Sequence, residues 1–287
     1  MTDAPRLDVR KTYKLYIDGQ FPRSESGRSY PVNGPDGRVL ARPARGSRKD
    51  LRDAVRAARA AWRGWSGATA YNRGQVLYRV AELMEGRRDQ FVRELEALGG
   101  KDAEREVEAA IDRWVWYAGW SDKVHHVMGT VNPVAGPYFN FTIPESTGVV
   151  GVVAPEEPAL LGLVSRVAPA VVSGNALVVI ASETRPLPAV TLSEVLATSD
   201  VPGGVINILT GLQRELLPWL ASHMDVNAID LTGTPSHLLA ELEEASAANV
   251  KRVVTNGETD YFDAAAQSPY AITALMEMKT VWHPMGA

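Results

Sequence analysis

The pattern of apolar residues changes along this chain, and its second half defines the fold. Beyond residue 148, short Val- and Ile-rich runs alternate with longer helical segments, and the runs cover residues 149–154, 177–180, 205–209, 228–231 and 252–254. Continuous apolar runs without polar alternation are typical of strands that are buried on both faces. Their alternation with helices predicts an α/β fold, in which five parallel strands form a Rossmann-like sheet with right-handed crossovers.

The first half of the chain shows helical spacing instead. After a polar leader and a hairpin whose turn is Asp18-Gly19, Ser47 and Asp50 form a capping-box pattern that opens a helix. Further segments with apolar residues at helical spacing continue to residue 123. We therefore expect four successive amphipathic helices that make a helical layer.

Between these halves, residues 127–134 and 138–143 predict a β-ribbon, with Pro133 and Gly136-Pro137 at its turn. Such a ribbon is not stable alone and must pack on other structure. After residue 254 the alternation ends, and residues 270–282 predict a short helix that leads into a last strand at 278–281. The expected organisation is a hairpin and helical part (1–123), a ribbon arm (124–147), a Rossmann-like part (148–256), and a linker with a terminal strand (257–287).

Composition excludes several classes of partner. Hydrophobic residues make up 45% of the sequence and charged residues 22%, which is ordinary for a soluble globular protein. The formal net charge of −4 gives no attraction to nucleic acid or to an anionic membrane. The longest apolar runs are too short to span a membrane, and the first residues lack the apolar segment of a signal peptide. We therefore expect a cytoplasmic protein.

The sequence contains no cysteine, which excludes disulfides, thiolate metal sites and a thiol nucleophile. The histidines are not spaced as a pair of metal ligands on a helix, so no metal site is predicted. They are His125, His126, His223, His237 and His283.

Ligands of an open α/β sheet bind outside the carboxyl ends of its strands, which here means residues 155–158 and 180–183. No G-x-G-x-x-G pattern follows the first strand. Glu156 and Glu157 stand in the first of these places, where they could act as an acid and a base with separated pKa values. Adjacent residues seldom converge on one substrate atom, however. We therefore favour the interpretation that they begin a helix, where the dipole stabilises negative side chains.

Several segments carry motifs that occur together in one enzyme family. They include Leu15-Tyr-Ile-Asp-Gly-Gln-Phe, Ser173-Gly-Asn-Ala-Leu-Val-Val, Pro202-Gly-Gly-Val-Ile-Asn-Ile-Leu-Thr-Gly and Leu231-Thr-Gly-Thr. With these motifs the chain resembles the NAD(P)-dependent aldehyde dehydrogenase superfamily. The resemblance implies the family's cofactor-binding domain and its projecting β-ribbon. It also implies a truncated, pseudoenzyme-like member, because residue 254 is followed almost directly by a segment similar to the family's C-terminal strand, without the catalytic domain and its nucleophilic Cys.

The resemblance marks four site positions that have changed. Glu157 replaces the Asn that helps to form the family's oxyanion hole, and a carboxylate there would repel an oxyanion. Ile180 replaces the Lys that contacts the adenosine ribose, and Asn256 replaces the general-base Glu. Leu238 replaces the second Gly of the turn beside the cofactor phosphates. No catalytic residue is therefore expected.

Other positions of the family's cofactor site are retained. They are Glu183, Gly211, Gly233 and Thr234. Their retention is compatible with vestigial cofactor binding, although turn and cap geometry alone also explains these residue types. Loss of a hydrogen bond to a charged group lowers affinity about tenfold to a hundredfold. We therefore expect either no NAD(P) binding or weak binding.

In the family, the ribbon and C-terminal strand of one subunit lie against the catalytic-domain sheet of its neighbour. This chain has the arm without the domain that would receive it, so we expect a non-catalytic structural or regulatory subunit that docks on a full-length aldehyde dehydrogenase by β-augmentation. Arms of two copies could instead pair with each other. A sensor of NAD(P) or another nucleotide and an enzyme with altered chemistry are the alternative functions. The residues expected at the contact are Val127, Tyr138, Phe139, Phe141, Val281 and Trp282.

Overall fold

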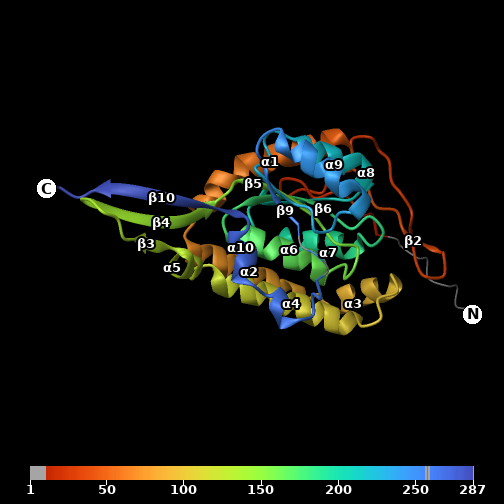
Figure 1. Ribbon diagram of the computed structural model, residues 1–287. Coiled ribbons are helices and arrows are strands. Elements are labelled where there is room, and N and C mark those ends of the chain that lie inside the picture. Colours follow the sequence, from red (N-terminus) through yellow and green to blue (C-terminus); the bar gives the residue numbers. More distant parts are fainter. Residues whose placement is uncertain (1–10, 256, 258, 287) are drawn as a thin grey trace, which may run out of the picture.

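The computed structural model describes residues 11–255, 257 and 259–286, and its centre is a five-stranded sheet (Figure 1). All four strand pairs are parallel, and the order is β7-β6-β5-β8-β9. The strands are β5 (Val149–Val153), β6 (Ala176–Ile180), β7 (Ile206–Leu209), β8 (Ala228–Asp230) and β9 (Arg252–Val254). This confirms the predicted α/β fold. The chain runs outward from β5 to β7 and then returns to β8, so the strand order reverses between β5 and β8.

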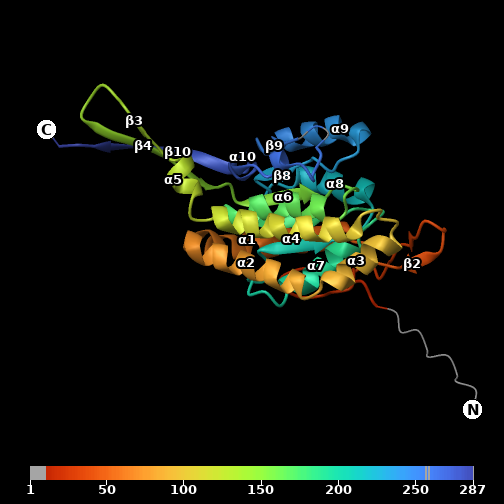
Figure 2. The same ribbon diagram turned by 90° about the horizontal axis from the view of Figure 1, so that it is seen from below.

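Alternating side chains of the sheet enter two separate cores. In β5, Val150 and Val152 face one core, whereas Val149 and Val153 face the other. Both faces are covered by helices, as Figures 1 and 2 show. The first core is covered by α6 (Leu161–Val172) and α7 (Leu187–Leu196), with α2 (Ala70–Glu85), α3 (Arg88–Ala97) and α4 (Ala103–Trp120) outside them; the second is covered by α1 (Arg48–Gly67), α8 (Gln213–Ser222) and α9 (Ser236–Ala247).

The four N-terminal helices do not lie on one side of the sheet. Helices α2, α3 and α4 form the predicted layer, whereas α1 packs on the opposite face. The chain passes around the amino edge of the sheet between α1 and α2, where Trp65 Nε1 donates to the carbonyl of Val171 (2.9 Å) and Arg73 Nε donates to that of Val172 (3.2 Å). Spacing within each helix gave its apolar side, but not which face of the sheet that side covers.

The N-terminal hairpin closes one edge of the sheet. Asp18 and Gly19 have φ values of 53° and 71°, which is the left-handed geometry that the predicted primed turn requires. Tyr16 forms an antiparallel bridge to Ile208 on β7, so the outer edge of β7 is partly covered. A second small hairpin consists of β1 (Val32–Asn33) and β2 (Val39–Ala41).

A three-stranded antiparallel sheet projects from the body (Figures 1 and 2). Its order is β10-β4-β3, with β3 (Thr130–Asn132), β4 (Tyr138–Ser146) and β10 (Met276–Pro284). We call these three strands the arm. Strand β10 is longer than the predicted 278–281 and pairs with β4 from Met276↔Ser146 to Pro284↔Tyr138.

The prediction that the ribbon begins at Val127 is wrong. Val127 lies in a short helix, α5 (Val124–Met128), and its amide donates to the carbonyl of Lys123 (3.0 Å). Gly129 ends this helix, and the strand begins only at Thr130. The segment Val124–Met128 is too short for its apolar spacing to separate a helical turn from a strand.

The connection from β9 to the arm covers part of the core. It contains a 3₁₀ turn (Ala264–Ala266) and α10 (Pro269–Thr273). Arg113 of α4 donates to the carbonyl of Tyr261 (2.8 Å), and the side chains of Tyr261, Ile272 and Leu275 are buried in the first core. Residues 259–275, which precede β10, therefore belong to the folded body.

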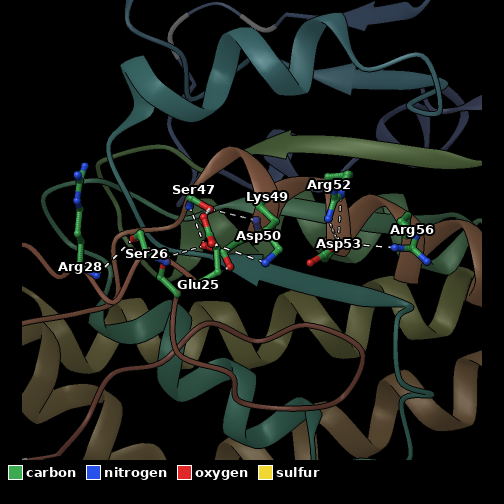
Figure 3. A network of polar contacts seen from close by, with 10 residues as sticks. Glu25, Ser26, Arg28, Ser47, Lys49, Asp50, Arg52, Asp53 and Arg56 are labelled. Carbon is green, nitrogen blue, oxygen red and sulfur yellow. Dashed lines mark hydrogen bonds and ion pairs between the residues drawn. The ribbon is translucent and has the colours of Figure 1, made fainter.

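A buried carboxylate fixes the start of α1 (Figure 3). Asp50 accepts hydrogen bonds from the amide of Ser47 (2.8 Å), the amide of Glu25 (3.1 Å) and the hydroxyl of Ser24 (2.7 Å). The Ser47 hydroxyl accepts in turn from the Asp50 amide (3.3 Å), which completes the predicted capping box. Asp50 thus ties the loop at residue 25 to the first turn of the helix.

The Asp50→Ala variant should lose about 2 to 3 kcal/mol of unfolding free energy, because three donors lose a buried charged acceptor. The matched control is Asp53→Ala, one turn further on, where an exposed carboxylate pairs with Arg52 and Arg56 and with no other described residue. That change should be nearly neutral, within about 0.5 kcal/mol. Urea denaturation of both variants measures the difference. Equal losses would mean that the Asp50 contacts do not hold the loop.

Candidate functional site

The loops that follow β5, β6, β7 and β8 lie at the carboxyl edge of the sheet, where the retained family positions also lie. Glu183 follows β6, Gly211 follows β7, and Gly233 with Thr234 follows β8. The strand order reverses between β5 and β8, which is the point where open α/β sheets bind ligands. The four positions that the resemblance marks as retained therefore gather at one edge of the sheet.

Glu156 organises this edge by accepting hydrogen bonds from the loop after β6. Its Oε2 atom accepts from the hydroxyl of Ser182 (2.6 Å), and from the amide (3.0 Å) and hydroxyl (2.5 Å) of Thr184. Its Oε1 atom accepts from the amide of Glu183 (2.8 Å) and from Nε2 of Gln213 on α8 (3.1 Å). One side chain from the β5 loop thus connects two other crossovers.

The interpretation that Glu156 and Glu157 begin a helix is wrong. Helix α6 begins at Leu161, and the amides of Leu160 and Leu161 donate instead to Glu106 of α4 (2.7 and 3.3 Å). Burial raises the pKa of the Glu106 carboxyl, and these two amides act against that shift. Glu106, which is distant in the sequence, therefore caps the start of α6 in place of Glu156 and Glu157.

The carboxylates of the two glutamates do not converge on one point. The Glu156 carboxylate points to the β6 loop, whereas Glu157 is an exposed residue that forms an ion pair with Arg185 (2.5 Å). The two side chains therefore have separate partners. By the resemblance, Glu157 stands where the family has its oxyanion donor, and a carboxylate at that position would repel an oxyanion.

The retained residues have structural partners of their own. The Glu183 carboxylate accepts from the amide of Gln213 (2.7 Å), so it caps the first turn of α8. Gly211 has a φ of 158°, and a Cβ atom there would lie 2.9 Å from Leu216 Cδ1. These contacts give Glu183 and Gly211 a role in turn and cap geometry without a ligand.

The turn that contains Gly233 packs directly on the end of β5. A Cβ atom at Gly233 would lie 2.4 Å from the carbonyl oxygens of Val153 and Ala154, so only glycine fits. The buried Thr234 hydroxyl has no hydrogen-bond partner among the described residues. The Gly233 turn therefore lies in backbone contact with the end of β5 and leaves no space between β5 and β8 at this point, which we call the crevice floor.

Two of the changed positions belong to the core. Ile180 is fully buried in the core beside α1, and Leu238 of α9 packs half-buried against that core. Neither side chain offers a polar atom to a ligand. The third, Asn256, lies outside the described residues.

A buried ion pair beneath the turn after β8 was not predicted from the sequence. Nε and Nη2 of Arg166 on α6 both lie 2.6 Å from the same Asp230 oxygen, and both side chains are almost completely buried. The other Asp230 oxygen accepts from the amide of Thr232 (3.0 Å). Asp230 ends an apolar run and Arg166 lies inside an apolar helix. The only sequence signal for this pair was therefore one charged residue within each of two apolar segments.

The residues at this edge do not fit the dinucleotide that the resemblance implies. Ile180 has no donor for a ribose, and the donors of the β6 loop already bind Glu156. Glu183 is engaged by α8, and the Gly233 turn rests on β5. Open space lies beside the loops instead, in clefts of about 570 Å³ next to Glu157 and Arg185 and about 510 Å³ next to Glu183.

Away from this edge, the described residues form a further cleft, but neither a metal cluster nor a membrane-spanning helix. Within residues 11–255, 257 and 259–286, no three His, Asp or Glu side chains are grouped to hold a metal ion. None of the helices in these ranges has the length and apolar character needed to cross a membrane. A cleft of about 680 Å³ lies away from this edge, at the start of α1, where the Arg48 guanidinium stacks 3.7 Å from the ring centre of Trp219.

Sequence comparison connects most of the chain to one family. Residues 21–259 match the aldehyde dehydrogenase family. The chain is 35% identical to retinal dehydrogenase 2 of Homo sapiens over 87% of this chain and 49% of that protein. It is 35% identical to the mitochondrial benzaldehyde dehydrogenase of Antirrhinum majus over 84% of this chain and 46% of that protein. The omega-crystallin of Nototodarus sloanii is 31% identical over 84% of this chain and 50% of that protein.

Solved structures give the same connection. HpcC from Thermus thermophilus superimposes with a TM-score of 0.81 at 29% identity, over 85% of this chain and 48% of that chain. PnpE from a Pseudomonas species has a TM-score of 0.79 at 28% identity, over 85% of this chain and 50% of that chain. The chain spans about half the length of the curated relatives it matches.

Replacement of Gly233 by Ala should destabilise the fold by about 1 to 3 kcal/mol, because the new methyl group would overlap the β5 backbone. Gly119→Ala in α4 is the control, since a Cβ atom there meets nothing within 4 Å. This control should be neutral or gain up to about 1 kcal/mol from helix propensity. Denaturant titration measures both changes. A Gly233→Ala protein as stable as the control would show that the crevice floor is open.

Proposed function

The chain belongs to the aldehyde dehydrogenase family, and we propose that it is a non-catalytic subunit that docks on a full-length aldehyde dehydrogenase through its arm. The arm is the observation that carries this proposal. It projects from the body as a separate three-stranded sheet (Figure 2), and both of its faces expose large apolar side chains. Surfaces of this kind mark sites of protein association.

The non-catalytic part of the proposal is supported by the residues at the carboxyl edge. Covalent catalysis in the family needs an activated thiolate, and the sequence has no cysteine. Glu157 carries a negative charge at the oxyanion position, and Asn256 stands at the position of the general base. The neighbouring carboxylate of Glu156 is fully hydrogen-bonded. No side chain here has the role of the missing nucleophile.

One face of the arm carries an apolar row. Val131, Phe141 and Val281 lie directly opposite one another on β3, β4 and β10, so their side chains share a face. Phe139 extends this row, with its ring centre 5.4 Å from that of Phe141. The opposite face carries Tyr138 and Trp282, whose rings meet edge to face at 5.7 Å. The predicted contact residues of the arm therefore divide between two faces, while Val127 lies on α5.

The outer edge of β10 supports docking by strand addition. Strand β10 pairs with β4 on one side, and no strand of the described structure pairs with its other side. It exposes nearly all of its nine residues, Met276–Pro284. An unpaired edge of this length is a template for another strand. We therefore place the partner's sheet against β10, with the apolar row covered in the same contact.

The alternative functions have less support at the site. A nucleotide sensor needs free donors at the carboxyl edge, and the donors of the β6 loop are bound to Glu156. An enzyme with altered chemistry needs a nucleophile or base that points into open space. Pairing of two arms in a homo-oligomer uses the same β10 edge as the proposed docking, and the experiment below separates the two.

The purified chain should form no reduced cofactor from NAD⁺ or NADP⁺ with any aldehyde in a broad panel. The reason is the loss of the thiolate nucleophile together with the charge at Glu157. The measurement is absorbance of the reduced cofactor, with a full-length aldehyde dehydrogenase as positive control. Turnover that persists in an independently purified batch and disappears in Glu157→Ala would overturn the non-catalytic assignment.

Coexpression with the full-length aldehyde dehydrogenases of the same host should give a mixed complex, which size-exclusion chromatography detects. Phe141→Asp and Val281→Asp should each abolish it, because a buried unpaired charge would replace an apolar contact. Thr280→Asp is the matched control. It changes the neighbouring residue of the same strand on the opposite face, and it should keep the complex.

Two outcomes would count against this docking mode. The proposal is contradicted if the wild-type protein elutes as a monomer when expressed alone and forms no complex with any coexpressed aldehyde dehydrogenase. A homodimer that forms without a partner and dissociates in Phe141→Asp would favour pairing of two arms.

A further inference from the structure

We propose that Glu156 is a built-in ligand. Its carboxylate fills a carboxylate-binding site formed by the loop after β6 and the first turn of α8, and removal of the side chain creates a site for a small monocarboxylate such as acetate. This inference is independent of the proposed docking, because the arm takes no part in it.

The binding site is built from donors that converge on one point. Three come from side chains, namely the hydroxyls of Ser182 and Thr184 and the amide group of Gln213. Two are the backbone amides of Glu183 and Thr184. Consecutive amides of this kind form a concave anion site, which is independent of the side chain that fills it.

The chemistry of these donors selects a carboxylate. A carboxylate presents two oxygens with about four lone-pair directions, and here Oε1 takes two donors while Oε2 takes three. All five donors are neutral. Among the described residues Glu156 forms no ion pair, since the nearby Arg185 pairs with Glu157. A singly charged planar group therefore fits this site better than a phosphate dianion.

The Glu156 carboxylate joins three crossovers of this edge. Glu156 comes from the β5 loop, and its partners lie on the β6 loop and on α8. The contact therefore fastens three crossovers together at the place where an external ligand of this fold would bind. The internal carboxylate replaces the stabilisation that a bound ligand gives a folded protein.

Chemical rescue tests the proposal. Glu156→Ala removes Cγ and the carboxyl group, and acetate has the same two carbons and two oxygens. The variant should unfold at a lower midpoint temperature, by roughly 5 °C or more, because five hydrogen bonds are lost. Acetate at neutral pH and constant ionic strength should raise that midpoint in a saturable way, with chloride as the reference salt.

A second variant tests the fit by length. Glu156→Gly removes one further carbon, so propionate should raise its midpoint more than acetate does, whereas acetate should act better on Glu156→Ala. This reversal of preference is expected only if the ligand takes the place of the deleted atoms. A general salt effect would act on both variants alike.

Two controls complete the design. Glu156→Gln keeps the space filled, so acetate should not act on it beyond its small effect on the wild type. Glu157→Ala removes the adjacent exposed carboxylate, whose partner is Arg185, and it should show no rescue. The proposal is overturned if Glu156→Ala responds to acetate no more than the wild type. It is also overturned if both cavity variants stay unfolded at every carboxylate concentration.

Discussion

Burial of the central strands on both faces is the constraint on which the other features depend. Every residue of β5 and β6 is buried, so each face of the sheet needs a layer of helices. Helices α1, α8 and α9 cover one face, and α6 and α7 with their outer layer cover the other. This arrangement requires crossovers at each end of the sheet. It brings together, at the carboxyl edge, loops that are far apart in the sequence.

Buried strands were predictable from the sequence because a strand buried on both faces consists of a run of apolar residues without polar alternation. The arm has a weaker apolar pattern in the sequence, since both of its faces are exposed to solvent. In β10, Glu277, Lys279 and His283 interrupt the apolar residues, so only its middle was predicted as a strand. Val127 was misplaced for the same reason, because a short exposed segment has no burial pattern that separates a helix from a strand.

The contacts of the carboxyl edge could not be predicted in the same way. Glu156 and its partners Ser182 and Gln213 are separated by 26 and 57 positions, and no local rule connects them. The sequence predicted a site at these loops, because ligand sites in this fold class lie at strand ends. It did not give the side-chain directions there. Local reasoning assigned Glu156 to the helix that follows it, whereas the folded chain supplies Glu106 for that cap.

The arm and the carboxyl edge lie at opposite ends of the sheet, which explains how one could be retained while the other changed. The base of the arm is fixed at the amino edge, where the carbonyl of Leu275 accepts from the Thr147 hydroxyl and from the Asn175 amide group, both at 2.8 Å. Thr147 and Asn175 lie just before β5 and β6. Glu156 follows β5 and Ile180 ends β6, so both lie at the other end of these strands from the anchor of the arm. Glu156 joins the loops at the carboxyl edge, whereas Leu275 joins the arm to the amino edge.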